Sequence, residues 1–428
     1  MKSERNLHLD LTYSNLDWQH KGWPIGTEID LEDVSSQGWN LFEDEFQFPV
    51  IVLNDAAMQH NIETMRRFCE SSGIDLAPHG KTTMSPEISH RQLDAGAWAI
   101  TAATTSQARI FKAFDVPRIL IASQVVDPAG LRWAWRELQK DPNFEFICLV
   151  DSEDCVSAME RGLENEANGR PINVLVELGI EHGRTGLRTV ESAFSVASRI
   201  AESSRLQLVG VEGYEGILRW ENEDFTAVDA FLTRMRKLTE KIAGKGLFDD
   251  TDEVIVTAGG SMFQDRIALI LGGRWDIGRP VRTVLRSGCY VTHDSRMYAE
   301  TSPFGKRGPM ENLPRLQASL WIWGYVLSRP EPDLALVGFG KRDVSHDVHL
   351  PHPFAVKRGE IIEETSELTV FDLNDQHAYI RLPADFPLSV GDMVGCGISH
   401  PCTTFDRWRA LPLIDDEYNV IGAVRTFF

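Results

Sequence analysis

The stretch "APHGKTTMSPE" (77–87) places a lysine, Lys81, beside a histidine, a glycine and two threonines. An apolar run precedes it, and a proline, a glutamate and the apolar spacing of a helix follow it. Lys81 therefore stands where a strand is expected to end and a helix to begin. In α/β folds, the carboxyl end of a strand is the usual position of catalytic groups. By itself, however, Lys81 would be interpreted as a surface lysine.

Three further segments place functional side chains or paired glycines at the ends of other expected strands. They are "ELGIEHGRTGLR" with Arg184, "GVEGYEG" with Tyr214, and "TAGGSMF" with Gly259, Gly260 and Ser261. Glycines let backbone N–H groups approach an anion, and the start of a helix favours phosphate. Each segment alone would be an ordinary tight turn. Together with Lys81 they describe a site with a lysine, an arginine, a tyrosine and a phosphate-binding turn.

A lysine that forms a Schiff base with pyridoxal phosphate would use all four of these features, because that cofactor carries both an aldehyde and a phosphate. The alternative in a barrel of this kind is a Schiff-base aldolase that acts on a sugar phosphate. That alternative leaves the C-terminal third of the chain without a role.

Short, nearly continuous apolar runs alternate with helical patterns through the first 300 residues. Such runs indicate a parallel sheet whose two faces are both covered. Eight or nine units over about 250 residues predict a closed (β/α)8 barrel of the TIM type. The count leaves open whether the first run, "PVIVLN" (49–54), belongs to the barrel.

Beyond about residue 300 the apolar runs follow one another with turns and without long helices, which predicts an all-β domain. The predicted fold class is therefore α/β, a (β/α)8 TIM-type barrel with a C-terminal all-β domain. The predicted boundaries are an N-terminal extension at 1–46, a cofactor-binding barrel at 47–301 and a β domain at 302–428.

The composition limits the partners and the compartment. A net charge of −20 and a pI near 5.0 argue against nucleic acid or an anionic membrane as partner, because both require clustered Lys and Arg. The N-terminus has no apolar segment of a signal peptide, and no run has the length of a membrane span. The six scattered cysteines form no Cys-x-x-Cys pair, which suits a reducing compartment. We expect a cytoplasmic protein.

From about residue 48 to the end, the order of these segments resembles the alanine racemase-like pyridoxal-phosphate enzymes, specifically the D-serine dehydratase and D-threonine aldolase branch. "PHGKTTMSPEISHRQLDAGA" (78–97) is similar to the Schiff-base segment of that branch. The resemblance implies that Lys81 binds the cofactor, that Arg184 contacts its phenolic oxygen and that Tyr214 lies near it. The other positions implied to contact the cofactor, most of them around its phosphate, are His79, Gly259, Gly260, Ser261, Gly288 and Tyr290.

A histidine and a cysteine two positions apart, His400 and Cys402, occur in "GISHPCTTFDRW" (397–408). On an extended segment they would share one face, and imidazole and thiolate are ligands that suit zinc. An isolated His-x-Cys pair is weak evidence of a metal. In the branch, however, a His-x-Cys or His-x-Asp pair at this place belongs to the metal site, and the pair in this chain resembles it. His-x-Cys resembles the dehydratases and His-x-Asp the aldolases.

One segment departs from the pattern of the branch. The branch usually has Glu-Glu-His-Gly upstream of the metal pair, whereas this chain has "LNDQHAYI" (373–380). His377 aligns, but Asp375 and Gln376 replace the acidic pair, which leaves the exact substrate open. A separate group of histidines is best interpreted as part of a polar loop: His346, His349 and His352.

The residues and the resemblance together predict a deaminating lyase that depends on pyridoxal phosphate and a metal. It would convert a D-3-hydroxy amino acid such as D-serine to a 2-oxo acid and ammonia, with Lys81, Arg184 and Tyr214 as catalytic residues. One alternative is a retro-aldol enzyme for D-threonine-like substrates, and another is a pyridoxal-phosphate carrier without turnover. Racemisation would need a second base, for which Tyr214 is a poor candidate. The resemblance also implies a homodimer.

Overall fold

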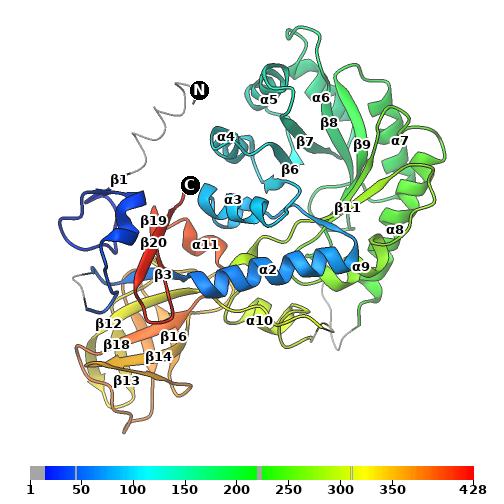
Figure 1. Ribbon diagram of the computed structural model, residues 1–428. Coiled ribbons are helices and arrows are strands. Elements are labelled where there is room, and N and C mark those ends of the chain that lie inside the picture. The colour runs from blue at the N-terminus through cyan, green and yellow to red at the C-terminus, as the bar shows by residue number, and fades with distance from the viewer. Residues whose placement is uncertain (1–14, 44–45, 219–223, 309, 311) are drawn as a thin grey trace. The chain divides into compact units, whose positions relative to one another are not determined.

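The computed structural model forms two compact units (Figure 1). The residues it describes are 15–43, 46–218, 224–308, 310 and 312–428, so that parts of the predicted N-terminal extension (1–14 and 44–45) lie outside them. The first unit, here the barrel unit, comprises Met65–Lys81 and Ser89–Gly288. The second, here the β unit, comprises Met1–Thr64, Thr82–Ile88 and Cys289–Phe428.

In its described residues, the barrel unit contains one sheet of eight parallel strands. Their order is β4 (Asp75–Leu76), β11 (Val281–Leu285), β10 (Val254–Ala258), β9 (Leu206–Gly213), β8 (Ile172–Leu178), β7 (Glu145–Val150), β6 (Arg118–Gln124) and β5 (Ile100–Ala102). The two ends of the sheet meet, because Trp98 N donates to Leu76 O at 2.7 Å and Thr101 N donates to Pro78 O at 2.9 Å. The predicted barrel is confirmed.

Helices lie on the outside of these strands, as Figure 1 shows for β6 to β9. They are α4 (Thr105–Ala113), α5 (Pro128–Lys140), α6 (Glu153–Gly162), α7 (Val190–Ala201), α8 (Thr226–Ala243) and α9 (Gln264–Leu271). Side-chain oxygens cap the backbone N–H groups at the start of four helices, α4 to α7, and so hold the turns that follow the strands: Thr104, Asp127, Ser152 and Thr189.

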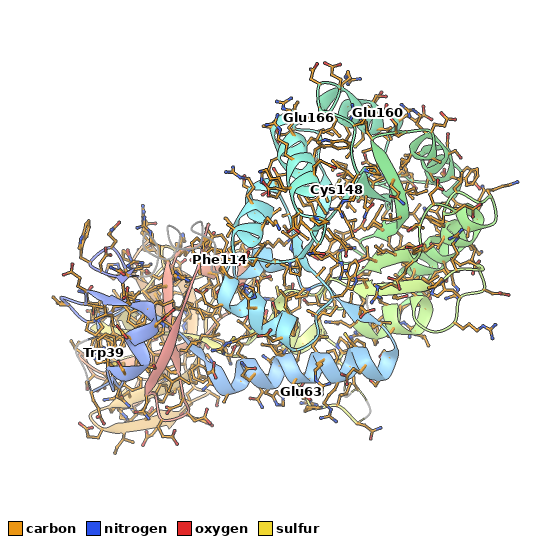
Figure 2. The ribbon with its side chains drawn as sticks, turned by 45° about the horizontal axis from the view of Figure 1, so that its top comes forward. Trp39, Glu63, Phe114, Cys148, Glu160 and Glu166 are labelled. Carbon is orange, nitrogen blue, oxygen red and sulfur yellow. The ribbon has the colours of Figure 1, made fainter. Side chains whose placement is uncertain are left out.

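One buried apolar cluster takes a side chain from each strand of the barrel or from the residue beside it, as the interior of a closed barrel requires. Its members are Ala77, Ala99, Leu120, Ile147, Leu149, Leu175, Val209, Ile255 and Val284. Cys148, labelled in Figure 2, is a buried free thiol of β7.

The β unit is built on a mostly antiparallel sheet, which confirms the predicted all-β fold of the C-terminal part. The main path runs β15 (Ile361–Glu364), β14 (His352–Arg358), β18 (Met393–Gly397), β12 (Leu320–Glu331), β13 (Leu334–Val337), β17 (Ala378–Arg381) and β16 (Thr369–Leu373). Attached to it are β3 (Val50–Asn54), β19 (Ala410–Ile414) and β20 (Val420–Arg425).

The first apolar run of the sequence, "PVIVLN", lies in the β unit and not in the barrel. Its strand β3 pairs antiparallel with β12 and parallel with β19, and all five of its residues are buried. The predicted barrel segment, 47–301, therefore includes a strand of the other sheet. The remaining barrel position is filled by β4, whose two residues are too few for hydrophobic periodicity to mark.

The described part of the N-terminal extension packs into the core of the β unit. Trp23 and Leu41 are buried in one apolar cluster with Trp323 and Ile414. Trp39, labelled in Figure 2, packs against this cluster, and its ring centroid is 6.2 Å from that of Trp23. Trp23 and Trp39 of the extension thus contribute to the core that the C-terminal strands form.

The remaining elements are short, with the exception of α2. They are β1 (Asn15–Leu16), β2 (Ile29–Asp30), η1 (Leu31–Ser36), α2 (Asp55–Ser72), η2 (Gly80–Thr82), α3 (Pro86–Asp94), η3 (Cys289–Val291), α10 (Met297–Thr301) and α11 (Cys402–Phe405). Among the described residues, no helix combines the length and the apolar character that a bilayer crossing requires. The six cysteines are all free thiols.

Candidate functional site

Lys81 lies in η2, directly after the carboxyl end of β4. Its side chain is exposed, and it makes no hydrogen bond or ion pair with any described residue. The preceding Gly80 is buried, and a Cβ there would lie 2.4 Å from the ring of Phe111 on α4. Only glycine therefore allows the turn to pack against α4. The result is a free amine at the strand ends of the barrel.

His79 stands between β4 and Lys81 and forms a parallel bridge with Thr101 of β5. Its Nδ1 atom is buried and has no hydrogen-bond partner among the described residues. Burial, together with the charges of Lys81 and Arg286, holds the pKa of His79 well below its usual value. The imidazole is therefore neutral at physiological pH.

Arg184 and Tyr214 come together at the ends of β8 and β9. The guanidinium carbon of Arg184 lies 4.5 Å from the ring centroid of Tyr214, a cation–π contact. The tyrosine ring fills space that two glycines leave free. A Cβ at Gly216 would lie 2.4 Å from the Tyr214 hydroxyl, and a Cβ at Gly260 would lie 3.3 Å from its ring. These glycines are thus needed for the tyrosine as well as for their turns.

The turn of Gly259, Gly260 and Ser261 follows β10 and precedes α9. Gly259 has a φ of 127°, which side chains rarely adopt. Gly260 N donates to Glu215 Oε1 at 2.9 Å, and Gly260 O accepts from Ser287 Oγ at 2.6 Å. The glycine turn is formed, its assignment to the phosphate stays a prediction, and the N–H of Gly260 already has a carboxyl partner. A phosphate would use the other donors of the turn.

A buried ion pair that the sequence analysis missed joins β9 to the end of β11. Arg286 is 3% exposed and donates to Glu212, to Thr257 Oγ1 at 2.9 Å and to Gly213 O at 3.3 Å. Burial raises the pKa of Glu212 to about 8, although the charge of Arg286 opposes this shift. The only signal in the sequence was an arginine directly after an apolar strand.

Two further carboxyls are buried at the same strand ends, Glu177 of β8 and Glu215 after β9. Thr185 Oγ1 donates to Glu177 Oε1 at 2.7 Å, and Glu215 Oε2 has no partner among the described residues. Burial raises the pKa of both carboxyls. The cations Lys81, Arg184 and Arg286 lie at the same strand ends as these carboxyls, and Arg286 pairs with Glu212. This environment fits an anionic aldehyde cofactor.

The last two positions assigned to the cofactor follow β11. Gly288 is the final residue of the barrel unit and is buried, and Tyr290 is buried in η3 of the β unit. Their assignment to the phosphate stays a prediction.

In the β unit, His400 and Cys402 follow β18. The segment is not extended as we expected, because His400 has a left-handed φ of 59° and Cys402 begins α11. The two side chains nevertheless interact. A hydrogen bond with Cys402 raises the pKa of His400 to about 9. The backbone of His400 is held by Asp294, whose Oδ2 accepts from His400 N at 3.3 Å.

Asp347 orients the imidazole of His400, a contact that the sequence analysis did not predict. His400 Nδ1 lies 2.6 Å from Asp347 Oδ2, and Thr403 Oγ1 donates to Asp347 Oδ1 at 3.1 Å. A carboxylate on one ring nitrogen is the usual arrangement of a histidine that binds a metal through the other. Of the neighbouring histidines, His346 and His349 lie in a loop, as predicted, whereas His352 begins β14.

A second thiol lies beside Cys402. Cys289 Sγ is 3.5 Å from Cys402 Sγ, and Cys402 Sγ is 3.4 Å from Thr82 Oγ1. The hydrogen bond between the thiols holds the pKa of Cys402 well below, and that of Cys289 well above, the usual value. Cys402 is thus the thiolate of the two. Thr82 directly follows Lys81 in the sequence.

The donor set fits a divalent metal with an incomplete protein shell. Among the described residues, no group of three or more His, Cys, Asp or Glu side chains is arranged to hold a metal. His400 Nε2 and Cys402 Sγ supply two ligands of types that suit zinc, and further positions would be left for water and substrate.

The barrel unit has a free lysine among cations at its strand ends, and the β unit has a His-x-Cys pair. Together these features are typical of a cofactor-dependent enzyme. Residues 53–262 match the family described as alanine racemase, N-terminal domain, and residues 319–414 match the putative serine dehydratase domain. The chain thus carries an alanine racemase-like domain followed by a putative serine dehydratase domain, and its curated relatives include a D-threonine aldolase and a D-threo-3-hydroxyaspartate dehydratase.

Individual relatives span nearly the whole chain. The D-threonine aldolase of Arthrobacter sp. is 25% identical over 372 residues, which cover 86% of this chain and 89% of the aldolase. The solved D-threonine aldolase of Filomicrobium marinum is similar with a TM-score of 0.73 at 21% identity, over 89% of this chain and 95% of that one.

The solved D-threo-3-hydroxyaspartate dehydratase of Delftia sp. HT23 has a TM-score of 0.69 at 21% identity, over 89% of this chain and 97% of that one. Structures also exist of variants of a D-threo-3-hydroxyaspartate dehydratase in which a histidine or a cysteine, two positions apart, is replaced by alanine. The cysteine variant is in a metal-free form. Identities this low show the fold alone.

Proposed function

We propose that the chain is a lyase, dependent on pyridoxal phosphate and a divalent metal, that dehydrates a D-3-hydroxy amino acid such as D-serine to a 2-oxo acid and ammonia. The observation that carries this proposal is the pair of His400 and Cys402 with Asp347 on the imidazole. The dehydratase variants described above support it, because they change a histidine and a cysteine with the same spacing.

The barrel unit supplies the residues for the cofactor. Lys81 would hold it covalently through Nζ, and Arg184, fixed over the ring of Tyr214, would bind its phenolic oxygen. When bound, pyridoxal phosphate withdraws electrons from the substrate's Cα, and the metal acts as a Lewis acid towards an oxygen group. The phosphate would be held by the turn of Gly259–Ser261 through donors other than Gly260 N.

Lys81 is also the candidate base. Its Nζ has no hydrogen bond or ion pair with a described residue, so that, once the substrate amine has released it from the cofactor, it would be free to take the α proton of the substrate. The proton would be taken from one face only, because a single amine approaches it. This geometry suits a substrate of one configuration, which we propose to be D.

The β unit supplies the residues for the metal. Asp347 holds Nδ1 of His400, so that Nε2 is the ring nitrogen that would bind the metal after it releases its own proton. Cys402 would supply a thiolate as the second ligand. Overall, the dehydration releases the β-hydroxyl with a proton as water and leaves the Cα–Cβ bond intact.

A retro-aldol reaction is the second candidate, and one observation favours it. The relative that matches 86% of this chain is a D-threonine aldolase. In that reaction the β-hydroxyl loses only its proton and the Cα–Cβ bond breaks, which yields glycine and an aldehyde. Cys402 is the feature that weighs against it, since His-x-Asp resembles the aldolases.

The test is a product analysis. The purified holoenzyme is incubated with the D and L forms of serine, threonine and 3-hydroxyaspartate, and ammonia, 2-oxo acid and glycine are assayed together. We expect 2-oxo acid and ammonia in equal amounts from a D substrate and no reaction of the L forms. Glycine and aldehyde as the main products would replace the proposal by the aldolase.

The proposal includes zinc as the metal, a homodimer and a cytoplasmic location. Imidazole and thiolate suit zinc, and six free thiols suit a reducing compartment. Elemental analysis and light scattering of the purified protein test the first two, and fractionation of the source cells tests the third.

A further inference from the structure

The β unit contains a cavity of about 630 Å³ that the proposed reaction does not use. Four of its lining side chains are cationic, and a single one is acidic; they are Lys21, Lys341, Arg342, Arg407 and Asp343. We call it the basic cavity. None of the residues assigned to the cofactor or to the metal lines it.

The charge of the basic cavity is opposite to that of the whole chain. The protein has 43 Lys and Arg against 63 Asp and Glu, a net charge of −20. A concave surface with four cations and one carboxylate reverses that balance locally. Concave walls of one charge concentrate the field and attract ions of the opposite sign.

The single acidic side chain of the cavity, Asp343, already has its partners. It is 3% exposed, and its Oδ1 accepts from Lys21 Nζ at 2.9 Å. Its Oδ2 accepts from Gly340 N and from Gln376 Nε2, each at 3.0 Å. The charge of Asp343 is therefore balanced by Lys21. Lys341 has no ion pair with a described residue, and the carboxylates that pair with Arg342 and Arg407 do not line the cavity.

A backbone carbonyl holds the guanidinium of Arg407, backbone bonds fix the main chain of Lys341 and Arg342, and the ion pairs of the two arginines are exposed. Arg407 Nε donates to Lys341 O at 2.9 Å, and the Lys341 and Arg342 N–H groups bind the chain at 374–375. Arg342 pairs with Asp375 and Arg407 with Asp406, but these carboxylates are 68% and 42% exposed. Such exposed pairs contribute little, so an incoming anion can replace them.

Gln376 connects this cavity to the segment that departs from the branch. The resemblance described above implies an acidic residue at its place, whereas here its amide donates to Asp343. A carboxylate at this position would face Asp343 and add a negative charge to the cavity. The departure therefore makes the cavity more favourable to anions.

We propose that the basic cavity binds a small organic anion with two or more carboxylate or phosphate groups. Two guanidinium groups and an ammonium group match such oxygens, and guanidinium groups bind them in bidentate fashion. Phe48 and Pro49 add an apolar wall against the carbon skeleton of the ligand. The volume is in the usual range of small-molecule sites. This proposal does not depend on the proposed lyase reaction.

The test is isothermal titration of the holoenzyme at low salt with tricarballylate, inorganic phosphate and acetate. We expect tricarballylate or phosphate to bind at one site per chain and more tightly than acetate. Binding of tricarballylate alone assigns the site to carboxylates, and binding of phosphate alone to phosphorylated ligands. If neither anion binds more tightly than acetate, the proposal is overturned.

Variants locate the binding. The double change Lys341→Ala and Arg407→Ala should weaken binding about tenfold or more, because two charged hydrogen-bond donors are lost. Gln376→Glu should weaken it without removing a side chain.

The matched control removes two cations from a second basic surface, on α5, by Arg132→Ala and Lys140→Ala. On that surface Arg136 pairs with Glu166, labelled in Figure 2. Unchanged affinity in the cavity variants, or an equal loss in the control, would show that no site exists there. Circular dichroism of each variant confirms that it is folded.

Discussion

The barrel unit and the β unit position their chemistry in different ways. In the barrel, the candidate residues follow strands of one closed sheet, so that topology alone brings Lys81, Arg184 and Tyr214 to the same end. In the β unit, His400 has a left-handed φ, Cys402 begins a four-residue helix, and their partners come from distant segments. A repeated architecture makes the place of a site predictable, whereas an irregular turn does not.

The largest expected effect is in the barrel. Lys81→Ala should remove the visible absorbance of the bound cofactor and reduce turnover by at least about 10²–10⁴-fold, because the amine is both the point of attachment and the base. Lys140→Ala, an exposed lysine of α5, is the control. If the Lys81→Ala variant keeps the visible absorbance and the activity, Lys81 is not the lysine that binds the cofactor.

The next prediction tests the β unit by separating its two adjacent thiols. Cys402→Ala should lose the metal and the dehydration but keep the cofactor absorbance, because the two groups have separate ligands. Cys289→Ala should keep most of the metal, because Cys289 is the thiol and Cys402 the thiolate. Elemental analysis after dialysis measures both.

A chelator should have the same effect as Cys402→Ala, and added zinc should restore activity. Full turnover after complete removal of metal would show that the reaction needs no metal in the β unit. Equal metal loss in both cysteine variants would show that Cys402 and Cys289 do not differ as ligands.

A smaller effect is expected for the partner of the metal histidine. Asp347→Asn keeps the shape of the side chain but weakens its hold on the Nδ1 proton, so that metal affinity should fall about 10–100-fold. Competition with a chelating dye measures the affinity, and the cofactor absorbance should not change. Asp406→Asn, directly after α11, is the control. An unchanged affinity would mean that Asp347 has no part in metal binding.

The smallest effect concerns stability in the barrel. The pKa of Glu212 is raised to about 8 from a usual value of 4.5, so that between these values the folded chain keeps a proton that the unfolded chain has lost. This contribution to stability is full below about pH 4.5 and is lost as the pH rises through about 8.

The corresponding slope is about 1.4 kcal/mol per pH unit. Glu212→Gln should flatten this part of the pH profile of the melting temperature, since the amide cannot lose a proton. Glu145→Gln, which is partly exposed, should leave the profile unchanged. The prediction fails if the profile of Glu212→Gln matches that of the unchanged chain.

The fold of the barrel was predictable because nearly every strand has its own apolar run and its own helix. The place of Lys81 just before α3 was predictable from its own segment, although the two residues of β4 are too few to mark a strand. β3 was not assignable, because a buried strand has the same composition in either sheet. Asp347 and Arg286 were missed because their partners, His400 and Glu212, are more than 50 residues away in the sequence. No local pattern marks such a pair.

The pairing of β3 with β12 and β19 has a consequence for the order in which the protein can fold during synthesis. Residues 50–54 leave the ribosome early, but their partners at 320–323 and 413–414 are made last. A strand whose residues are all buried in the folded protein therefore stays unpaired while most of the chain is translated. The barrel can close during this interval, whereas the β unit cannot be completed before the C-terminus is released. We expect nascent chains of this protein to need protection at residues 50–54.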